Sequence, residues 1–329
     1  MPIIVADSLS KHFRVHQKEE GLKGSLKNVF FRKYEDKIAV DRIEFALEEG
    51  ELVGFLGPNG AGKTTTLKML TGLIHPTSGR AEVMGFVPWE RKNEFRRQYA
   101  LIMGQKNQLW MDLPAMESFL LNREVYQIPE RQFKKTLDEL VALLEVEPVL
   151  KVQVRRLSLG ERMKMEMIAA LLHRPRVLFL DEPTIGLDII SQRKIREFLH
   201  GYNQAFGTTI LLTSHYMEDI QALCKRVIII NHGRKVYDGQ LDRIVQDFSA
   251  YKELTVTFAA PVSREALAGI AVIQEYDPAK VTFRVKREEL IGVLGRLLGE
   301  FKVDDINTAE VEIAEVISQI FRQSGEATA

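Results

Sequence analysis

The 329-residue chain is predicted to fold as an α/β protein with a mostly parallel sheet, followed by a small α+β domain. Three observations predict the first part. A glycine-rich loop joins a short apolar strand to a helix, apolar strands then alternate with helical stretches, and residues with evident chemistry fall where strands end. Because ligands of such sheets lie beyond the carboxyl ends of the strands, the sequence predicts one site at one sheet edge.

The glycine-rich loop has the spacing of a phosphate-binding loop, G-x-x-x-x-G-K-T. After the predicted strand over 52–56 come Gly57, Pro58, Asn59, Gly60, Ala61, Gly62, Lys63, Thr64 and Thr65. Backbone N–H groups of residues 60–64 can surround an anion, and the helix starting near Lys63 adds its positive end. Lys63 should bridge the terminal phosphates and Thr64 should bind Mg²⁺. A chance glycine turn is the alternative, which the strand, loop and helix order disfavours.

Composition narrows the class of protein. Lys+Arg and Asp+Glu both number 45, so no overall field favours nucleic acid as a partner. The single cysteine, Cys224, rules out an internal disulfide, and its helical context predicts a packed thiol. No apolar run approaches the ~18 residues of a membrane-spanning helix, and residues 1–13 lack a signal-peptide layout. We therefore expect a cytosolic protein that meets a membrane only through a partner.

The first half is predicted to contain short strands around the loop. They cover residues 3–9, 38–47, 80–84 and 99–103, the first ending at residues 10–13. The alternation over 38–47 predicts a half-buried antiparallel strand, so an antiparallel β subdomain is expected beside the parallel sheet. Between the first two lies a basic segment, 18–37, with the pattern of an amphipathic helix. Such a helix would lie at a membrane surface or against a partner protein. Alternatively, it would be a solvated helix that packs on its own domain. Residues 108–156 have a helical pattern and form a predicted helical insert.

The second half returns to the α/β pattern. Strands are predicted over 177–180, 209–212 and 227–230, helices over 191–205 and 217–224, and a hairpin at 231–233. From residue 250, predicted strands (254–258, 272–275, 281–285, 303–306) and helices (264–268, 288–298, 311–321) follow the order of a ferredoxin-like domain. The predicted boundaries are a phosphate-binding α/β domain over 1–248 and an accessory domain over 249–329.

Two further groups of residues carry chemistry. Asp181 and Glu182 end the strand over 177–180, where an aspartate can hold Mg²⁺ through water and a glutamate can polarise an attacking water. Ser158 and Gly160 lie at the start of a helix, where they can form a second anion site. Each group also has a purely structural explanation. Asp181 and Glu182 would then be ordinary acidic residues at a strand end, and Ser158 would only cap the helix.

Together these residues resemble the ATP-binding subunits of ABC transporters over about residues 3–248. The matching segments are Walker A (57–64), Walker B (177–182), the LSGGQ signature (157–161), the D-loop (186–188), the switch histidine His215 and the Q-loop glutamine Gln105. The C-terminal part resembles additions seen on some bacterial exporter ATPases.

The resemblance implies ATP and Mg²⁺ as ligands, and two copies that close head to tail around two ATP molecules. It implies Glu182, His215 and Gln105 as catalytic residues, and Thr64, Gln105 and Asp181 at the metal. The ATP held by Lys63 of one subunit would be contacted from the other by Ser158, Gly160, Glu161 and Asp188. The implied partners are a transmembrane permease and a second ATPase subunit, identical or related, with no nucleic acid. The implied location is peripheral, on the cytoplasmic face of the inner membrane.

The chain departs from the family pattern in several places. Leu159 replaces the second glycine of the signature, adding a side chain where backbone meets phosphate, and Glu161 replaces its glutamine. Either Phe13, before the basic insert, or Tyr34, just after it, would stack on adenine, and the family context favours Phe13. The insert itself resembles one in polysaccharide-type exporter ATPases.

Trp110 and Met111 would border the groove that receives the permease, although core packing explains Trp110 equally well.

These features predict a transport ATPase subunit that drives an exporter. A soluble ABC ATPase in translation or DNA maintenance is one alternative, although such proteins usually carry two cassettes or long coiled coils. A P-loop kinase is another, which the signature and His215 disfavour.

Overall fold

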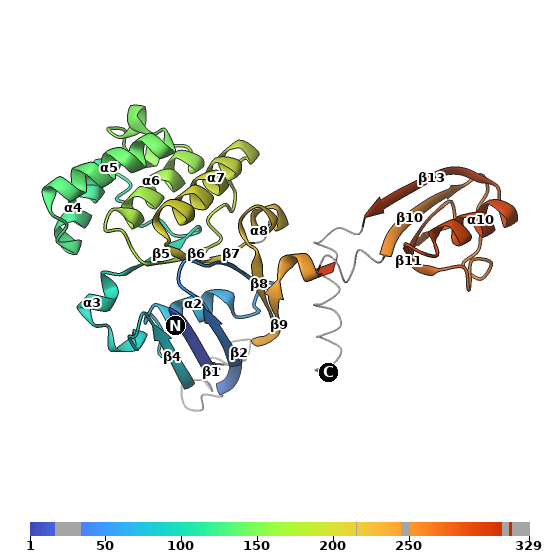
Figure 1. The fold of residues 1–329 in the computed structure, drawn as a ribbon, viewed down its shortest axis with the longest axis horizontal. Coiled ribbons are helices and arrows are strands. Elements are labelled where there is room, and N and C mark those ends of the chain that lie inside the picture. The colour runs from blue at the N-terminus through green and yellow to red at the C-terminus, as the bar shows by residue number, and fades with distance from the viewer. Residues whose placement is uncertain (17–33, 215, 245–250, 311–315, 318–329) are drawn as a thin grey trace, which may run out of the picture. The chain divides into compact units, whose positions relative to one another are not determined.

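The computed structural model describes residues 1–16, 34–214, 216–244, 251–310 and 316–317. Its backbone contacts divide the chain into two compact units, residues 1–239 and 240–329 (Figure 1). Within the described residues, no helix is both long enough and apolar enough to cross a membrane.

A six-stranded sheet in the order β5-β6-β7-β3-β8-β9 forms the centre of the first unit. Its strands are β3 (Leu52–Leu56), β5 (Tyr99–Met103), β6 (Val177–Asp181), β7 (Thr209–Thr213), β8 (Arg226–Asn231) and β9 (Arg234–Gln240). The first five are parallel neighbours and largely buried, as expected for strands covered on both faces. Pairing aligns Met103 with Asp181 and Asp181 with Thr213, so the carboxyl ends form one edge.

The predicted hairpin between β8 and β9 is confirmed. Its two turn residues, His232 and Gly233, both have positive φ, 47° and 77°, as a tight two-residue hairpin turn requires.

An antiparallel sheet in the order β2-β1-β4 lies on the other side of helix α2 (Lys63–Leu70). It contains β1 (Ile4–His16), β2 (Tyr34–Leu47) and β4 (Ser78–Val83). Leu67, Met69 and Leu70 of α2 share one buried cluster with residues of both sheets, which fixes the helix that follows the phosphate loop.

Strand β1 is longer than predicted. It continues through residues 10–13 to His16, because β2 pairs with it as far as Tyr34 and satisfies its backbone groups. Residues 34–37 of the predicted amphipathic segment therefore form strand, and residues 17–33 lie outside the described part of the chain.

In the described part of the first unit, the further α-helices are α3 (Asn93–Arg96), α4 (Ala115–Tyr126), α5 (Glu130–Leu144), α6 (Leu159–Leu171), α7 (Ile189–Phe206) and α8 (Met217–Leu223). The predicted helical stretch over 108–156 contains α4 and α5. Both pack on α6, and α6 in turn packs on β5 of the central sheet (Figure 1).

The second unit is a four-stranded antiparallel sheet in the order β11-β12-β10-β13. Its elements are β10 (Tyr251–Phe258), β11 (Val272–Asp277), β12 (Lys280–Lys286), α10 (Leu290–Glu300) and β13 (Val303–Glu310). Alternate residues of β10 and β12 pack with Val293 and Leu297 of α10, as in the predicted ferredoxin-like fold.

The helix predicted over 264–268 is wrong. That segment forms turns with i→i+3 bonds, and Leu267 reaches the core without a helix. Most of the helix predicted over 311–321 lies outside the described residues.

Candidate nucleotide site

The phosphate loop lies between β3 and α2, with α2 beginning at Lys63 as predicted. Gly60 and Gly62 have φ of 81° and 106°, and a Cβ on Gly62 would lie 2.4 Å from the Ala39 carbonyl oxygen. The loop therefore needs glycine for both conformation and space. Lys63 Nζ donates to the carbonyls of Gly57 (2.6 Å) and Pro58 (3.1 Å), which holds the ammonium across the loop.

The ammonium of Lys63 is buried close to the two acidic residues at the end of β6. Burial lowers the pKa of Lys63, and the nearby Glu182 and Asp181 carboxylates oppose that shift. A triphosphate in the loop would add further negative charge beside this buried cation.

Asp181 is held between two hydroxyl groups at the carboxyl edge of the sheet. Thr64 Oγ1 donates to Asp181 Oδ2 at 2.7 Å, and Thr213 Oγ1 donates to Asp181 Oδ1 at 2.8 Å. Thr64 belongs to α2 and Thr213 ends β7, so the contact joins three elements. It brings together two of the residues predicted at the metal.

Glu182 adopts a left-handed backbone conformation, with φ of 56°. Its N–H donates to both the carbonyl and the hydroxyl oxygen of Thr213, each at 3.1 Å. A Cβ on Gly104 would lie 2.0 Å from the Glu182 carbonyl oxygen, so only glycine allows this approach. Gln105 Nε2 donates to Glu182 Oε2 at 3.5 Å. A backbone conformation that is rare for its residue type, and that surrounding contacts hold in place, is typical of functional residues.

Two cavities open onto these residues. One of about 360 Å³ is lined by the phosphate loop, Glu182 and Phe13, whereas Tyr34 is not among the residues that line it. The Phe13 ring is partly exposed and has Lys11 Nζ 5.3 Å from its centroid. The other, of about 210 Å³, brings Thr64, Gln105, Asp181 and Glu182 together with two lysines that were not predicted, Lys68 and Lys106.

The side chains of the smaller cavity fit a magnesium ion. Mg²⁺ prefers oxygen ligands and is usually bound by one or two carboxylates with phosphate and water. Thr64 and Asp181 offer a hydroxyl and a carboxylate 2.7 Å apart, and Gln105 offers an amide oxygen beside them. The described residues, this cavity included, contain no group of three or more His, Cys, Asp or Glu that could hold a metal without other ligands.

The signature segment caps α6. Ser158 Oγ accepts from Glu161 N at 3.2 Å, and Glu161 Oε2 accepts from Ser158 N at 2.9 Å and Oγ at 2.8 Å. These bonds from Ser158 lower the pKa of Glu161. The Glu161 carboxylate thus completes a capping box, which gives a structural reason for glutamate at this position.

Gly160 and Asp188 join the signature to the D-loop. A Cβ on Gly160 would lie 2.4 Å from Ser191 Oγ, so the start of α6 packs closely on the start of α7. Asp188 caps α7 by accepting from Ser191 N at 2.9 Å and Ser191 Oγ at 2.6 Å. The Leu159 side chain is 42% exposed and extends towards Gly186.

None of Ser158, Gly160, Glu161 and Asp188 lines either cavity of the same chain.

His215 lies outside the described residues, but the residues around it are well held. Asp219, which is 1% exposed, accepts from Ser214 Oγ at 2.6 Å and from Arg196 Nη1 at 2.8 Å. Ser214 Oγ in turn accepts from Tyr216 N at 3.0 Å.

Thr213 and Gly104 are parts of this site that were not predicted from the sequence. Thr213 directly precedes Ser214 and His215, and Gly104 directly precedes Gln105, so position next to a predicted residue was the available signal.

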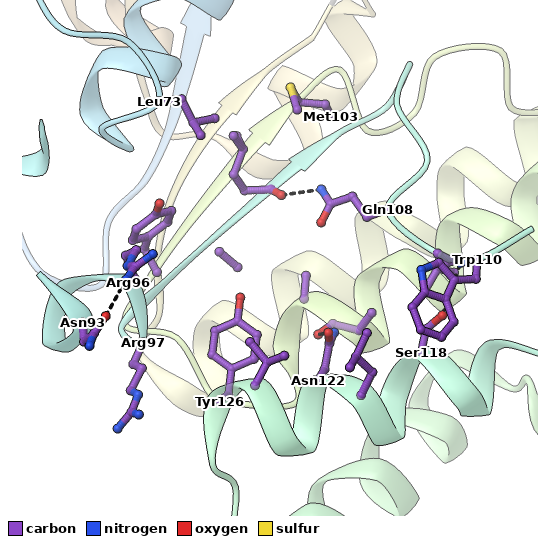
Figure 2. Close-up of a pocket in the computed structure, with 18 residues that line it drawn as sticks. Leu73, Asn93, Arg96, Arg97, Met103, Gln108, Trp110, Ser118, Asn122 and Tyr126 are labelled. Atoms are coloured by element: carbon purple, nitrogen blue, oxygen red, sulfur yellow. Dashed lines mark hydrogen bonds between the residues drawn. The ribbon is translucent and has the colours of Figure 1, made fainter. Parts of the chain in front are cut away.

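A larger cavity, of about 650 Å³, lies between β5 and the helices α3, α4 and α6 (Figure 2). Trp110 borders it and is 51% exposed, so core packing does not explain this residue. Arg96 and Arg97 lie at one end of the cavity, while Tyr126 and Asn122 of α4 form one side. We call this cavity the α4 groove.

The buried Cys224 matches its prediction as a packed thiol, since burial raises its pKa above the usual range.

A phosphate loop after β3, with an acidic pair at the carboxyl end of β6 in the same sheet, defines the class of nucleotide-binding ATPases. Comparison with known proteins narrows this class. Residues 40–185 match the family model for ABC transporters, and residues 250–308 match that for the C-terminal domain of EvrA-like ABC transporters.

Relatives of known name agree with these matches. The Nod factor export ATP-binding protein I of Burkholderia pseudomallei (strain 1710b) is 34% identical over 253 residues, which are 77% of this chain and 76% of that protein. The bacitracin transport ATP-binding protein BcrA of Bacillus licheniformis is 33% identical over 226 residues, 69% and 72% of the two chains. NatA, an ABC transporter ATP-binding protein of Bacillus subtilis (strain 168), is 34% identical over 219 residues, 65% of this chain and 89% of NatA.

Solved structures share the fold. An ATP-binding subunit of an ABC transporter superposes with a TM-score of 0.61 at 26% identity, covering 75% of this chain and 93% of that one. A dimeric ATP-binding cassette bound to ADP and Pi has a TM-score of 0.60 at 22% identity, and covers 72% and 98%.

This chain belongs to the ATP-binding subunits of ABC transporters. It is an ATPase subunit of a transporter, and the soluble and kinase alternatives find no support among these relatives.

Proposed function

We propose that this subunit drives export of a substrate through a separate transmembrane permease, by closure of two ATPase subunits around ATP. The relative named for Nod factor export supports the export direction. One observation supports the proposed dimer of ATPase subunits. The signature residues lie outside the cavities that contain the phosphate loop, so a second subunit must supply them if they are to contact ATP.

Within one subunit, the phosphate loop would bind the triphosphate through its N–H groups and Lys63. Thr64 and Asp181, with Gln105, would hold Mg²⁺, which when bound neutralises charge on the phosphate oxygens. The Glu182 carboxylate would orient the attacking water and accept its proton, and Gln105 is close enough to restrict the position of that carboxylate. Phe13, at the wall of the larger loop cavity, would stack on adenine.

Across the closed dimer, Ser158, Gly160, Glu161 and Asp188 would face the ATP bound by the partner, and His215 would contact the terminal phosphate. The N-terminal end of α6 carries a partial positive charge suited to this role. Because Gly160 packs on Ser191, movement at the signature would also shift the D-loop. ATP binding at one of the two sites could thus affect the other ATP site.

The α4 groove would receive a cytoplasmic helix of the permease, with Trp110 as an exposed aromatic contact. A subunit docked in this way would lie peripherally on the cytoplasmic face of the inner membrane.

The test is purification of the subunit with its membrane partner, followed by reconstitution in vesicles. ATP-dependent accumulation of a substrate, which also raises the ATPase rate, is expected on the side opposite the ATPase. Glu182→Gln is the matched control, since it should bind ATP, form a stable dimer and transport nothing. Recovery with ribosomes or DNA instead of a membrane protein would refute the proposal.

A further inference from the structure

Glu166 is a buried acidic residue to which the nucleotide site described above gives no role. It lies in the middle of α6 and is only 5% exposed. Acidic residues are almost never buried without partners, because removing a carboxylate from water costs free energy. The contacts that hold Glu166 inside the fold therefore indicate what it does.

The partners of Glu166 are backbone groups of the loop that follows β5. Glu166 Oε1 accepts from Gln108 N at 2.8 Å and from Leu109 N at 3.2 Å, two successive N–H groups. Gln108 Nε2 also donates to the Leu101 carbonyl, at 2.7 Å. Burial raises the pKa of Glu166, whereas the two backbone bonds and the nearby Arg162 oppose that shift. One oxygen of α6 thus satisfies two backbone donors of a loop that is distant in sequence.

We call residues 104–110 the Q-loop segment, and this segment is attached to the fold at both ends. At its start, Gly104 N donates to the Asp181 carbonyl at 2.8 Å, beside the acidic pair. Its other end is held by the side chain of Glu166. The three residues between these attachments, of which Gln105 is the first, are exposed. The position of Gln105 therefore depends on both attachments.

The Q-loop segment also borders two cavities. Gln105 lines the smaller cavity at the nucleotide site, whereas Gln108 and Trp110 line the α4 groove (Figure 2). Helix α6 itself starts directly after Ser158 of the signature, about two turns before Glu166. Glu166 thus ties the signature helix to the loop that runs from the metal position to the groove.

We propose that Glu166 is a positioning residue for ATP hydrolysis, whose carboxyl group holds the Q-loop segment so that Gln105 stays beside Glu182. The inference rests on the roles proposed above for Gln105 and Glu182. Loss of the acceptor leaves two backbone donors without their partner, and the segment shifts to find others. Gln105 then moves away from Glu182, while the phosphate loop is unchanged. ATP binding persists and hydrolysis slows.

The test compares Glu166→Gln with Glu166→Met in the purified full chain. Both new side chains are unbranched and of similar length, but only glutamine keeps an oxygen that can accept from the two N–H groups. Glu166→Met should lower kcat about tenfold and leave KM for ATP within about twofold of the parent value. Glu166→Gln should stay within about threefold of the parent kcat. Circular dichroism would verify that both variants are folded.

A double-mutant cycle with Gln105→Ala separates positioning from a merely structural role. Gln105→Ala alone should lower kcat, and adding Glu166→Met should lower it by less than about twofold more, because both changes disable the same group. A full tenfold further loss would overturn the role of Glu166 and leave the proposed function standing. The same holds for a parent-like kcat of folded Glu166→Met, or for equal losses in the methionine and glutamine variants. A parent-like kcat of Gln105→Ala would instead overturn the role proposed for Gln105, and this inference with it.

Discussion

Replacing Thr213 by valine tests how Asp181 is held at the end of β6. Thr213 is fully buried, and its hydroxyl donates to Asp181 Oδ1 at 2.8 Å and accepts from Glu182 N at 3.1 Å. Valine has nearly the same shape, so the change removes both bonds without opening a cavity. Glu182 N keeps its bond to the Thr213 carbonyl, and the main loss is therefore at Asp181.

The size of the expected stability loss follows from the negative charge of Asp181, which accepts the hydrogen bond. A hydrogen bond to a charged group contributes about 1.5–3 kcal/mol, more than a neutral one. We expect Thr213→Val to lower the free energy of unfolding by about this amount, measured from the urea midpoint. If the same energy orients Asp181 for catalysis, the turnover number should fall by about ten- to a hundredfold.

Thr213→Ser is the matched control, because serine keeps the hydroxyl and loses only a methyl group. It should retain most of the parent's ATPase activity, with a stability loss of about 1 kcal/mol. The assay is steady-state ATP hydrolysis at several Mg²⁺ concentrations. Equal turnover by the valine and serine variants would refute the reasoning, since the hydroxyl would then have no part in orienting Asp181.

Three other predictions concern separate parts of the structure. Ser158→Ala should lower turnover while ATP binding to the monomer, measured by calorimetry, stays intact; it should also cost about 1 kcal/mol of stability through loss of the helix cap. Gly104→Ala should reduce ATP hydrolysis strongly with the fold retained by circular dichroism, because the new Cβ would lie 2.0 Å from the Glu182 carbonyl oxygen. Burial lowers the pKa of His173 from 6.5 to about 4, so the unfolded chain binds more protons between these values. The free energy of unfolding should therefore rise by about 3 kcal/mol as the pH rises through this window, and His173→Phe, which can keep the stack on Tyr126, should remove most of that rise.

Much of the fold is readable from local sequence patterns. The strands over 52–56 and 99–103 have the predicted bounds, because short apolar runs suit buried parallel strands. Errors occur where pairing between distant segments decides the structure. Strand β1 continues to His16 only because β2 pairs with it, and the turns over 264–268 bury Leu267 without needing a helix.

The sequence by itself determined the phosphate loop, the acidic pair and the family, because G-x-x-x-x-G-K-T and its companion motifs are local and specific. Tertiary structure decided what surrounds them. Only the parallel register of β6 and β7 brings Thr213 to Asp181, and only the approach of two loops makes glycine necessary at Gly104. Ser158 was recognised from its motif, yet its position outside the cavities of its own chain is visible only in the fold. The physical reason is that a motif encodes local backbone geometry, whereas hydrogen bonds across a sheet depend on residues far apart in sequence.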